Sequence, residues 1–370
     1  MRSHAPTARH PIKTSRDDGR RWNLLTTLQT IAAQGTVSRA DIARSTGLTR
    51  ATVSTLVANL IENGLVREVG IGGVESAGKP PTLLSINDGG REIIALDLSH
   101  QPFQAAILDL TGAIRHRASA PRSATGLPAI DLVTDLVANC LAHSTAPILG
   151  IGVGTPGIID PDGTIREAAH LDWHEVPLRR LLAEKFATGV TVGNDAHVAA
   201  LAEFRSAADG SETLLLVAVG EGIGAGLVLD GVLHTGDNLS SGEIGHVVVE
   251  PRGATCRCGL RGCLETVAAV PAVIRLDNGG FDVSSAAEAG RHLGATLAVV
   301  ISAIDVDRVV IASELTALDA YLAAVTDELL ARVHPSRRPH VVVTASEVED
   351  LVLAGAAAAV MRDELGVVLR

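Results

Sequence analysis

One histidine and three cysteines lie close together in the second half of this 370-residue chain. His246 is followed by Cys256, Cys258 and Cys263, within the run Cys-Arg-Cys-Gly-Leu-Arg-Gly-Cys. One imidazole and three thiolates satisfy the tetrahedral preference of Zn²⁺, and the two glycines let the backbone fold around an ion. Because such a set leaves no ligand position open, the spacing predicts a structural zinc site. The alternative is a group of reduced cysteines without a metal.

Three segments around this run carry motifs of a known family. They read Ser-Gly-Glu-Ile-Gly-His at 241–246, Gly-Asn-Asp-Ala-His at 193–197 and Gly-Val-Gly-Thr-Pro-Gly at 152–157. Together with Cys-x-Cys-Gly-x-x-Gly-Cys-Leu-Glu, they resemble the signature of the ROK family (repressors, open reading frames and sugar kinases). The resemblance covers residues 22 to about 365. It implies an α/β fold in which an actin-like, two-lobed domain binds a sugar in its cleft.

The resemblance also implies which residues contact the sugar. Carboxylates and an amide hold neighbouring hydroxyls well, and a metal-bound imidazole is fixed in one tautomer. Taken without the surrounding motifs, Asn194-Asp195 is equally well explained as a helix N-cap. The predicted sugar contacts are Gly154, Asn194, Asp195, Glu243, His246 and Glu265, with His246 shared with zinc.

The motifs that would bind a nucleotide depart from the family pattern. The first phosphate loop usually reads Asp-x-Gly-x-Thr, but residues 97–101 read Asp-Leu-Ser-His-Gln. Glu221 places a carboxylate in the second loop, Ala-Ser-Glu at 312–314 replaces a Gly-Gly turn, and His197 replaces an asparagine. We therefore expect no catalytic residue and no ATP or Mg²⁺ cofactor. The alternative is a kinase in which Asp195 accepts the proton of the attacking hydroxyl.

Two similar strand pairs must hold these motifs. Strands at 93–98 and 103–110, before the turn Thr111-Gly112, are echoed by strands at 214–219 and 224–229, before Asp230-Gly231. The echo predicts two similar lobes with a cleft between them. Hydrophobic residues make up 46% of the chain and aromatic residues only 2%, which favours a closely packed aliphatic core.

The amino-terminal segment has the pattern of a winged helix-turn-helix. A helix from near Trp22 to Gly35 precedes a short helix with a capping box at Ser38-Arg39-Ala40-Asp41 and a third helix capped by Thr49. Strands at 65–69 and 82–86 would frame the wing. The third helix would enter the major groove. The predicted DNA contacts are Arg39, Thr49, Arg50, Thr52, Ser54, Thr55 and, at the wing tip, Lys79.

Charge is distributed in agreement with a DNA reader joined to a sensor. Residues 1–86 carry eleven Lys/Arg against six Asp/Glu, whereas the whole chain has a net charge of −11. Lysine and arginine attract phosphate. A solvated basic tail, or a small helical bundle that binds another protein, would have the same composition.

The predicted organisation is a disordered arm at 1–20, a winged helix-turn-helix at 21–86 and a sugar-binding domain at 87–370. No secretory or membrane-spanning segment is expected, which favours the cytoplasm, with the nucleoid as the location of the DNA-bound protein. The predicted partners are an operator in double-stranded DNA, a sugar or sugar phosphate effector, and copies of the chain in a homodimer or homotetramer.

The predicted function is that of a sugar-responsive transcriptional regulator, a repressor, whose effector acts either as inducer or as corepressor. Two alternatives stay open. One is an ATP-dependent sugar kinase with an accessory DNA-binding domain. The other is a constitutive DNA-binding protein whose sugar cleft is vestigial.

Overall fold

The computed structural model describes residues 16–72, 80–121, 125–207, 212–277 and 279–366. The chain divides into two compact units, Met1–Asn87 and Asp88–Arg370. Within the described ranges, no helix is both long and apolar enough to cross a membrane.

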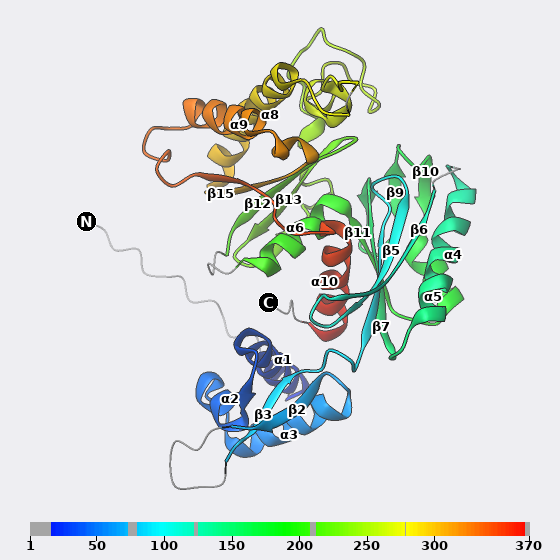
Figure 1. Cartoon of the computed structure of the whole chain (residues 1–370), viewed down its shortest axis with the longest axis vertical. Helices are drawn as coiled ribbons and strands as arrows, with labels where there is room; N and C mark the ends of the chain where they lie inside the picture. The colour runs from blue at the N-terminus through cyan, green and yellow to red at the C-terminus, as the bar shows by residue number, and fades with distance from the viewer. Residues whose placement is uncertain (1–15, 73–79, 122–124, 208–211, 278, 367–370) are drawn as a thin grey trace. The chain divides into compact units, whose positions relative to one another are not determined.

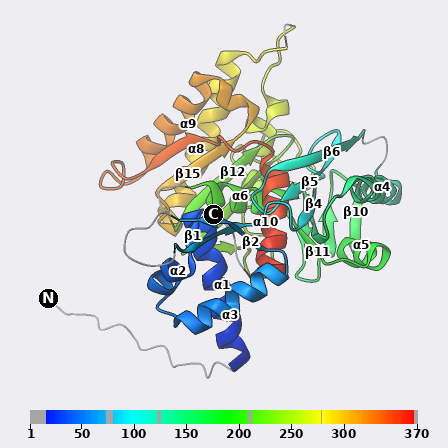
Figure 2. The same ribbon diagram turned by 60° about the horizontal axis from the view of Figure 1, so that its bottom comes forward.

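Three helices and a three-stranded sheet form the first unit (Figure 2). The helices are α1 (Arg16–Gln34), α2 (Arg39–Thr46) and α3 (Arg50–Glu62), and the sheet order is β1 (Val37–Ser38), β3 (Thr82–Ile86), β2 (Val66–Ile71). The start of α1 corrects one prediction, because residues 16–20 are helical and not a disordered arm. No proline follows Pro11 to stop the helix before its apolar stripe. Residues 1–15 of the predicted arm lie outside the described residues.

The predicted helix caps are confirmed. Ser38 forms a capping box with Asp41, and α2 ends at Gly47 in the left-handed conformation. Thr49 caps α3 by accepting a hydrogen bond from the amide of Thr52. The face of α3 opposite its polar side buries Val53, Leu56, Val57 and Leu60. Side-chain caps and one apolar stripe therefore fix where the short helices of this unit begin and how they pack.

Two five-stranded sheets organise the second unit. The first has the order β11 (Val190–Asn194), β7 (Ile148–Thr155), β4 (Glu92–Asp97), β5 (Phe103–Asp109), β6 (Ile114–Ala120). The second has the order β14 (Val232–His234), β13 (Ile223–Leu229), β12 (Leu214–Val219), β15 (Arg308–Ala312), β16 (Val342–Ala345). Both the β4–β5 and the β12–β13 pairs are antiparallel hairpins, as the sequence echo predicts. We call the parts built on these sheets the first and second lobes.

Helices cover one face of the five-stranded sheet in each lobe (Figure 1). In the first lobe these are α4 (Leu127–His143) and α5 (Leu178–Phe186), together with a small sheet of β8 (Ile158–Ile159), β9 (Ile165–Ala168) and β10 (Trp173–Val176). In the second lobe they are α8 (Val283–Ile304) and α9 (Asp319–Arg332). Short helical turns lie at η1 (Ile244–His246), α7 (Glu265–Ala268), η2 (Val270–Ala272) and η3 (Glu314–Ala317).

Helices α6 (Asp195–Ser206) and α10 (Leu351–Leu365) pack against each other between the two sheets. Their contact is close because it is made by small residues. A Cβ atom on Gly355 would lie 1.9 Å from the carbonyl oxygen of Val198, so only glycine fits there. Ala356 to Ala359 are buried beside it. This pair of helices brings the loops at the carboxyl ends of both sheets to one cleft.

Candidate functional site

A cavity of about 710 Å³ lies between the two lobes. The first lobe lines it with the ends of β4 and β7, the second lobe with the β12–β13 loop and the segment from 243 to 265. Five of the predicted sugar contacts line this one cavity, namely Asn194, Asp195, Glu243, His246 and Glu265. Residues separated by up to 71 positions in the sequence thus face the same space.

Gly154, the sixth predicted sugar contact, lies at a close packing contact between helices and sheet. It is not among the described residues that line the cavity. A Cβ atom at this position would lie 2.3 Å from Cγ1 of Val352 and 3.0 Å from Cγ2 of Val198. The missing side chain of Gly154 therefore makes room for α6 and α10 against β7.

Asn194 caps α6 and also lines the cavity. As the N-cap of α6, its Oδ1 accepts a hydrogen bond from the amide of His197 over 3.1 Å. Its Nδ2 donates to the carbonyl oxygen of Gly157 over 3.1 Å, while the side chain also lines the cavity. Asn194 therefore ties the start of α6 to the loop after β7 and leaves part of its amide on the cleft.

Asp195 is the first residue of α6 and lies deep in the cleft. Burial raises the pKa of its carboxyl group to about 6, and the negative charges of Asp97 and Glu243 act in the same direction. The amide of Ala196 and the His100 imidazole oppose the shift. At neutral pH the carboxylate form still dominates, so Asp195 accepts hydrogen bonds there.

This raised pKa makes the stability of the protein depend on pH. The folded state holds a proton on Asp195 up to about pH 6, whereas the ordinary value is 3.8, so the free energy of unfolding falls as pH rises between these values. Asp195→Asn keeps an acceptor for Ala196 and removes the charge. We expect the free energy of unfolding of the variant, relative to that of the wild type, to be higher at pH 7.5 than at pH 4 by up to about 3 kcal/mol. Denaturant unfolding at both pH values measures this, and an equal difference at both would contradict it.

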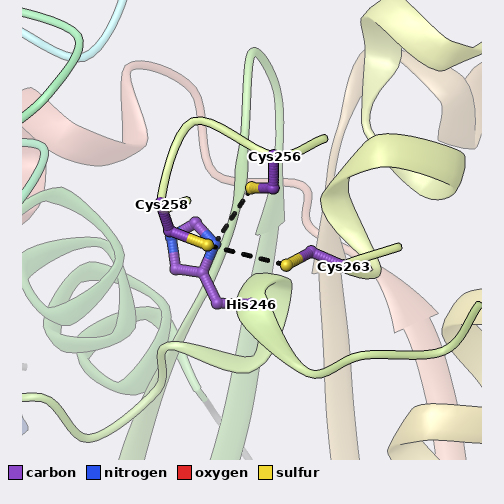
Figure 3. Close-up of side chains that lie close together, drawn as sticks. All are labelled: His246, Cys256, Cys258 and Cys263. Carbon is purple, nitrogen blue, oxygen red and sulfur yellow. Dashed lines mark hydrogen bonds between the residues drawn. The ribbon is translucent and has the colours of Figure 1, made fainter. Parts of the chain in front are cut away.

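The four predicted metal ligands form one cluster (Figure 3). Their ligand atoms all lie within 4.8 Å of one another, with Cys256 Sγ 3.6 Å from His246 Nδ1 and Cys258 Sγ 3.6 Å from Cys263 Sγ. Thiolates around a tetrahedral Zn²⁺ at about 2.3 Å are separated by similar distances. Gly262, at φ 71°, makes the turn possible, because a Cβ there would lie 1.6 Å from the carbonyl oxygen of Glu250. The cluster can hold a metal ion.

The cluster and the cleft share side chains. His246 directs Nδ1 to Cys256, and its Nε2 lies 3.7 Å from Oε2 of Glu243. Oε1 of Glu265 lies 3.3 Å from Sγ of Cys256. Burial and the neighbouring Glu265 carboxylate raise the pKa of Glu243. The cluster therefore fixes the position of one wall of the cleft.

His197, which departs from the family pattern, holds the adjacent loop. It is buried, and its Nε2 donates a hydrogen bond to the carbonyl oxygen of Ser241 over 2.8 Å. Burial lowers the pKa of the imidazole, in keeping with a neutral ring. His197 thus anchors the segment that carries Glu243. It is not one of the described residues that line the cavity.

The altered nucleotide loops border the same cavity. His100 lies between Ser99 Oγ, 2.7 Å from its Nδ1, and Asp97 Oδ2 at 3.7 Å. Its hydrogen bond with Asp97 raises the pKa of the imidazole, and the charges of Asp195 and Glu221 add to this effect. A Cβ on Gly220 would lie 3.2 Å from His100 Nε2, so the imidazole reaches the β12–β13 loop of the other lobe.

Sequence reasoning missed several residues that line the cavity, among them His170 and Arg257. His170 lies in the turn between β9 and β10, outside every motif that the sequence offers. Arg257 lies inside the cysteine run, whose spacing indicates a role for the thiols and not for the arginine. No sequence signal could have paired them, because 87 positions separate the two residues.

Most of the predicted DNA contacts lie on the outer side of α3. Thr49, Arg50, Ser54 and Thr55 are exposed, and Thr52 is half-buried. Arg39, at the start of α2, forms an ion pair of 3.0 Å with Glu68 on β2. Lys79 lies outside the described residues.

Two protein-family models match this chain. The model of the ROK family matches residues 93–363, and a model of the MarR family matches residues 25–72. The second match falls on α1, α2, α3 and β2. The first spans both lobes.

Individual relatives cover the chain to different extents. The xylose repressor of Caldicellulosiruptor bescii is 33% identical over 68% of this chain and 65% of its own length, so this chain spans less than two thirds of that relative. The DNA-binding transcriptional dual regulator NagC of Escherichia coli K12 is 29% identical over 90% of this chain and 91% of its own. A crystal structure of a ROK family transcriptional regulator, a homologue of an E. coli protein, superposes with a TM-score of 0.80 at 21% identity, covering 94% of this chain and 96% of that chain. At this identity the superposition establishes the fold: an amino-terminal winged helix followed by an actin-like, two-lobed domain.

Proposed function

This chain belongs to the ROK family, and on that premise we propose that it is a sugar-responsive, DNA-binding transcriptional repressor. The observation that carries the proposal is the convergence of five polar side chains on one cleft beside a metal cluster, in a chain that also has a winged helix-turn-helix. The relatives named as xylose repressor and as the regulator NagC support it. Operator DNA and a small sugar are then the two ligands, and the nucleoid is the place of action.

A regulator fits the cleft better than a sugar kinase does. The nucleotide side lacks the glycine and hydroxyl of a phosphate loop, and His100 fills part of the space between the two hairpin loops. Glu221 and Glu314 add negative charge to the same wall. Asp195 could accept a proton, but transfer of a phosphoryl group also needs bound and neutralised phosphates. We therefore assign no catalytic residue and no ATP or Mg²⁺ cofactor.

The cluster of one histidine and three cysteines has the ligands that a structural zinc ion requires. His246, Cys256, Cys258 and Cys263 would hold it, with no protein ligand missing and no open position for a reactant. Burial raises the pKa of the Cys256 thiol, so a thiolate there requires a cation close by. The ion would fix the tautomer of His246 and keep its Nε2 directed toward the cleft.

The charge of the cleft favours an uncharged sugar over a sugar phosphate. Eight carboxylates line it: Asp97, Glu167, Asp195, Glu221, Glu243, Glu265, Glu314 and Asp350. Among the described residues that line the cavity, Arg257 is the one arginine. Its guanidinium group already donates hydrogen bonds to His170 and to the carbonyl oxygen of Glu221. A phosphate dianion would meet like charges at low dielectric, whereas sugar hydroxyls donate to carboxylates.

Control of DNA binding would follow from closure of the cleft. Dimeric regulators place two recognition helices about 34 Å apart, one turn of DNA. A sugar that favours a closed cleft would shift the population of a homodimer or homotetramer toward one spacing of these helices. If the sugar favours a spacing that does not fit DNA, it is an inducer of this repressor. If it favours the spacing that fits DNA, it is a corepressor.

A titration of DNA affinity against sugar tests this function. A duplex selected by the protein from a random library would be titrated with and without D-glucose, D-xylose and N-acetyl-D-glucosamine, and with the 6-phosphates of the two hexoses. We expect at least one uncharged sugar to change the affinity and the phosphates to act more weakly. Sugar phosphorylation with Mg-ATP that Asp195→Asn abolishes would instead establish the kinase, and DNA affinity indifferent to all sugars would leave the cleft vestigial.

The same assay tests the recognition helix. Arg50→Ala should weaken DNA binding by about 1 kcal/mol or more if Arg50 contacts a base, and by less, at all sequences equally, if it contacts phosphate. Arg180→Ala is the matched control, because Arg180 is an exposed arginine on α5 in the other unit. Equal affinities of the two variants would exclude Arg50 as a DNA contact.

A further inference from the structure

One hydrogen-bonded pair joins the two walls of the cleft. His170 lies in the first lobe between Ala168 and Leu171, which are buried in the core of that lobe. Arg257 lies in the second lobe, between two cysteines of the metal cluster. Nη1 of Arg257 is 2.8 Å from Nδ1 of His170, and its Nη2 donates to the carbonyl oxygen of Glu221 over 3.2 Å.

This bond decides which nitrogen of His170 carries the proton. A guanidinium group only donates hydrogen bonds, so Nδ1 of His170 is the acceptor. The proton of the neutral imidazole is then on Nε2, and the ring is held with Nδ1 toward Arg257. Arg257 therefore acts as a positioning residue for His170.

Nε2 of His170 and the Glu265 carboxylate border the same point of the cavity from opposite lobes. A Cβ atom placed on Gly222 would lie 3.7 Å from Nε2 of His170 and 2.7 Å from Oε2 of Glu265. Both side chains line the cavity. A sugar hydroxyl accepts one hydrogen bond and donates another, so an N–H group and a carboxylate side by side are a matched pair for it.

We propose that His170 is a further sugar-binding residue, which donates from Nε2 to a hydroxyl that in turn donates to Glu265. The inference rests on the proposed function, since it names a contact within the same sugar site. Because the two groups belong to different lobes, a sugar held by both links the lobes. His170 would thus add a sugar-dependent link between the lobes to the hydrogen bond that Arg257 already makes.

Two isosteric substitutions separate binding from positioning. Asparagine places its amide group near Nδ1 of histidine, so His170→Asn keeps the partner of Arg257 but removes the donor at Nε2. Glutamine places its amide near Nε2, so His170→Gln keeps that donor. With whichever of D-glucose, D-xylose or N-acetyl-D-glucosamine binds the wild type, we expect His170→Asn to lose about tenfold in affinity and His170→Gln to lose clearly less.

Monodeoxy analogues of that sugar identify the contact. One analogue, which lacks the hydroxyl held by His170 and Glu265, should bind the wild type more weakly than the parent sugar does, and should bind the wild type and His170→Asn with about equal affinity. The sugar-free unfolding midpoint and the metal content of the variant should match the wild type. Calorimetric titration of wild type and both variants measures all these affinities.

The outcomes are distinguishable. If the wild type binds none of the sugars, the proposed function fails together with its sugar site. If the wild type binds but His170→Asn binds equally well, or if no analogue removes the difference, the role of His170 is refuted while the function stands. A variant that loses metal or thermal stability in proportion to its affinity would also count against direct contact.

Discussion

Cys258→Ser is expected to release the metal ion and to abolish sugar binding. Cys258 is exposed, so the change of sulfur to oxygen costs little packing, whereas Cys256 and Cys263 are buried. Binding of structural zinc contributes about 10–16 kcal/mol in zinc-finger peptides, and the proposed site would bind its ion more weakly without one of its three thiolates. The segment from 246 to 265 should then lose its order and carry His246 and Glu265 out of the cleft wall. Metal analysis of the purified protein and calorimetric sugar titration measure both effects.

Cys140→Ala is the matched control for this substitution. Cys140 is a buried cysteine on α4 in the first lobe and does not belong to the metal cluster. The control should keep its full metal content and its sugar affinity, even if its core packing is weaker. A wild-type protein that contains no zinc, or a Cys258→Ser variant that keeps both metal and sugar, would refute the structural role.

Glu265→Gln is expected to weaken sugar binding by about 10- to 150-fold while the metal stays bound. Glutamine has the shape of glutamate but lacks its charge, and a hydrogen bond to a charged group contributes about 1.5–3 kcal/mol. Glu265 is not one of the cluster's ligands, although its Oε1 lies 3.3 Å from Sγ of Cys256. Metal analysis and calorimetric titration again separate the two possible effects.

The matched control for Glu265→Gln is Glu288→Gln on α8. Glu288 pairs with Arg291 on the surface and does not line the cavity. Its loss should leave sugar affinity, metal content and DNA affinity unchanged, because exposed ion pairs contribute little. If Glu265→Gln behaves like this control, the convergence of carboxylates on the cleft has no part in sugar recognition.

Short-range patterns in the sequence determined much of the fold. The capping box at Ser38 and the cap at Thr49 are contacts between residues three positions apart, so the residue types alone predict them. The repeated hairpins follow from paired apolar runs, and each is followed by a Thr-Gly or Asp-Gly turn that leads into a third strand. The metal cluster is also predictable, because three of its four ligands lie within eight residues and the fourth comes ten residues before them.

Only the tertiary structure decided the roles that depend on distant neighbours. Gly154 has the sequence context of a sugar contact, yet the side chains of Val352 and Val198 occupy the space beside it. His170 belongs to no motif, yet the fold places it against Arg257 and opposite Glu265. Spacing along the chain predicts contacts within a turn or a helix, whereas the packing of two lobes around α6 and α10 sets what meets across the cleft.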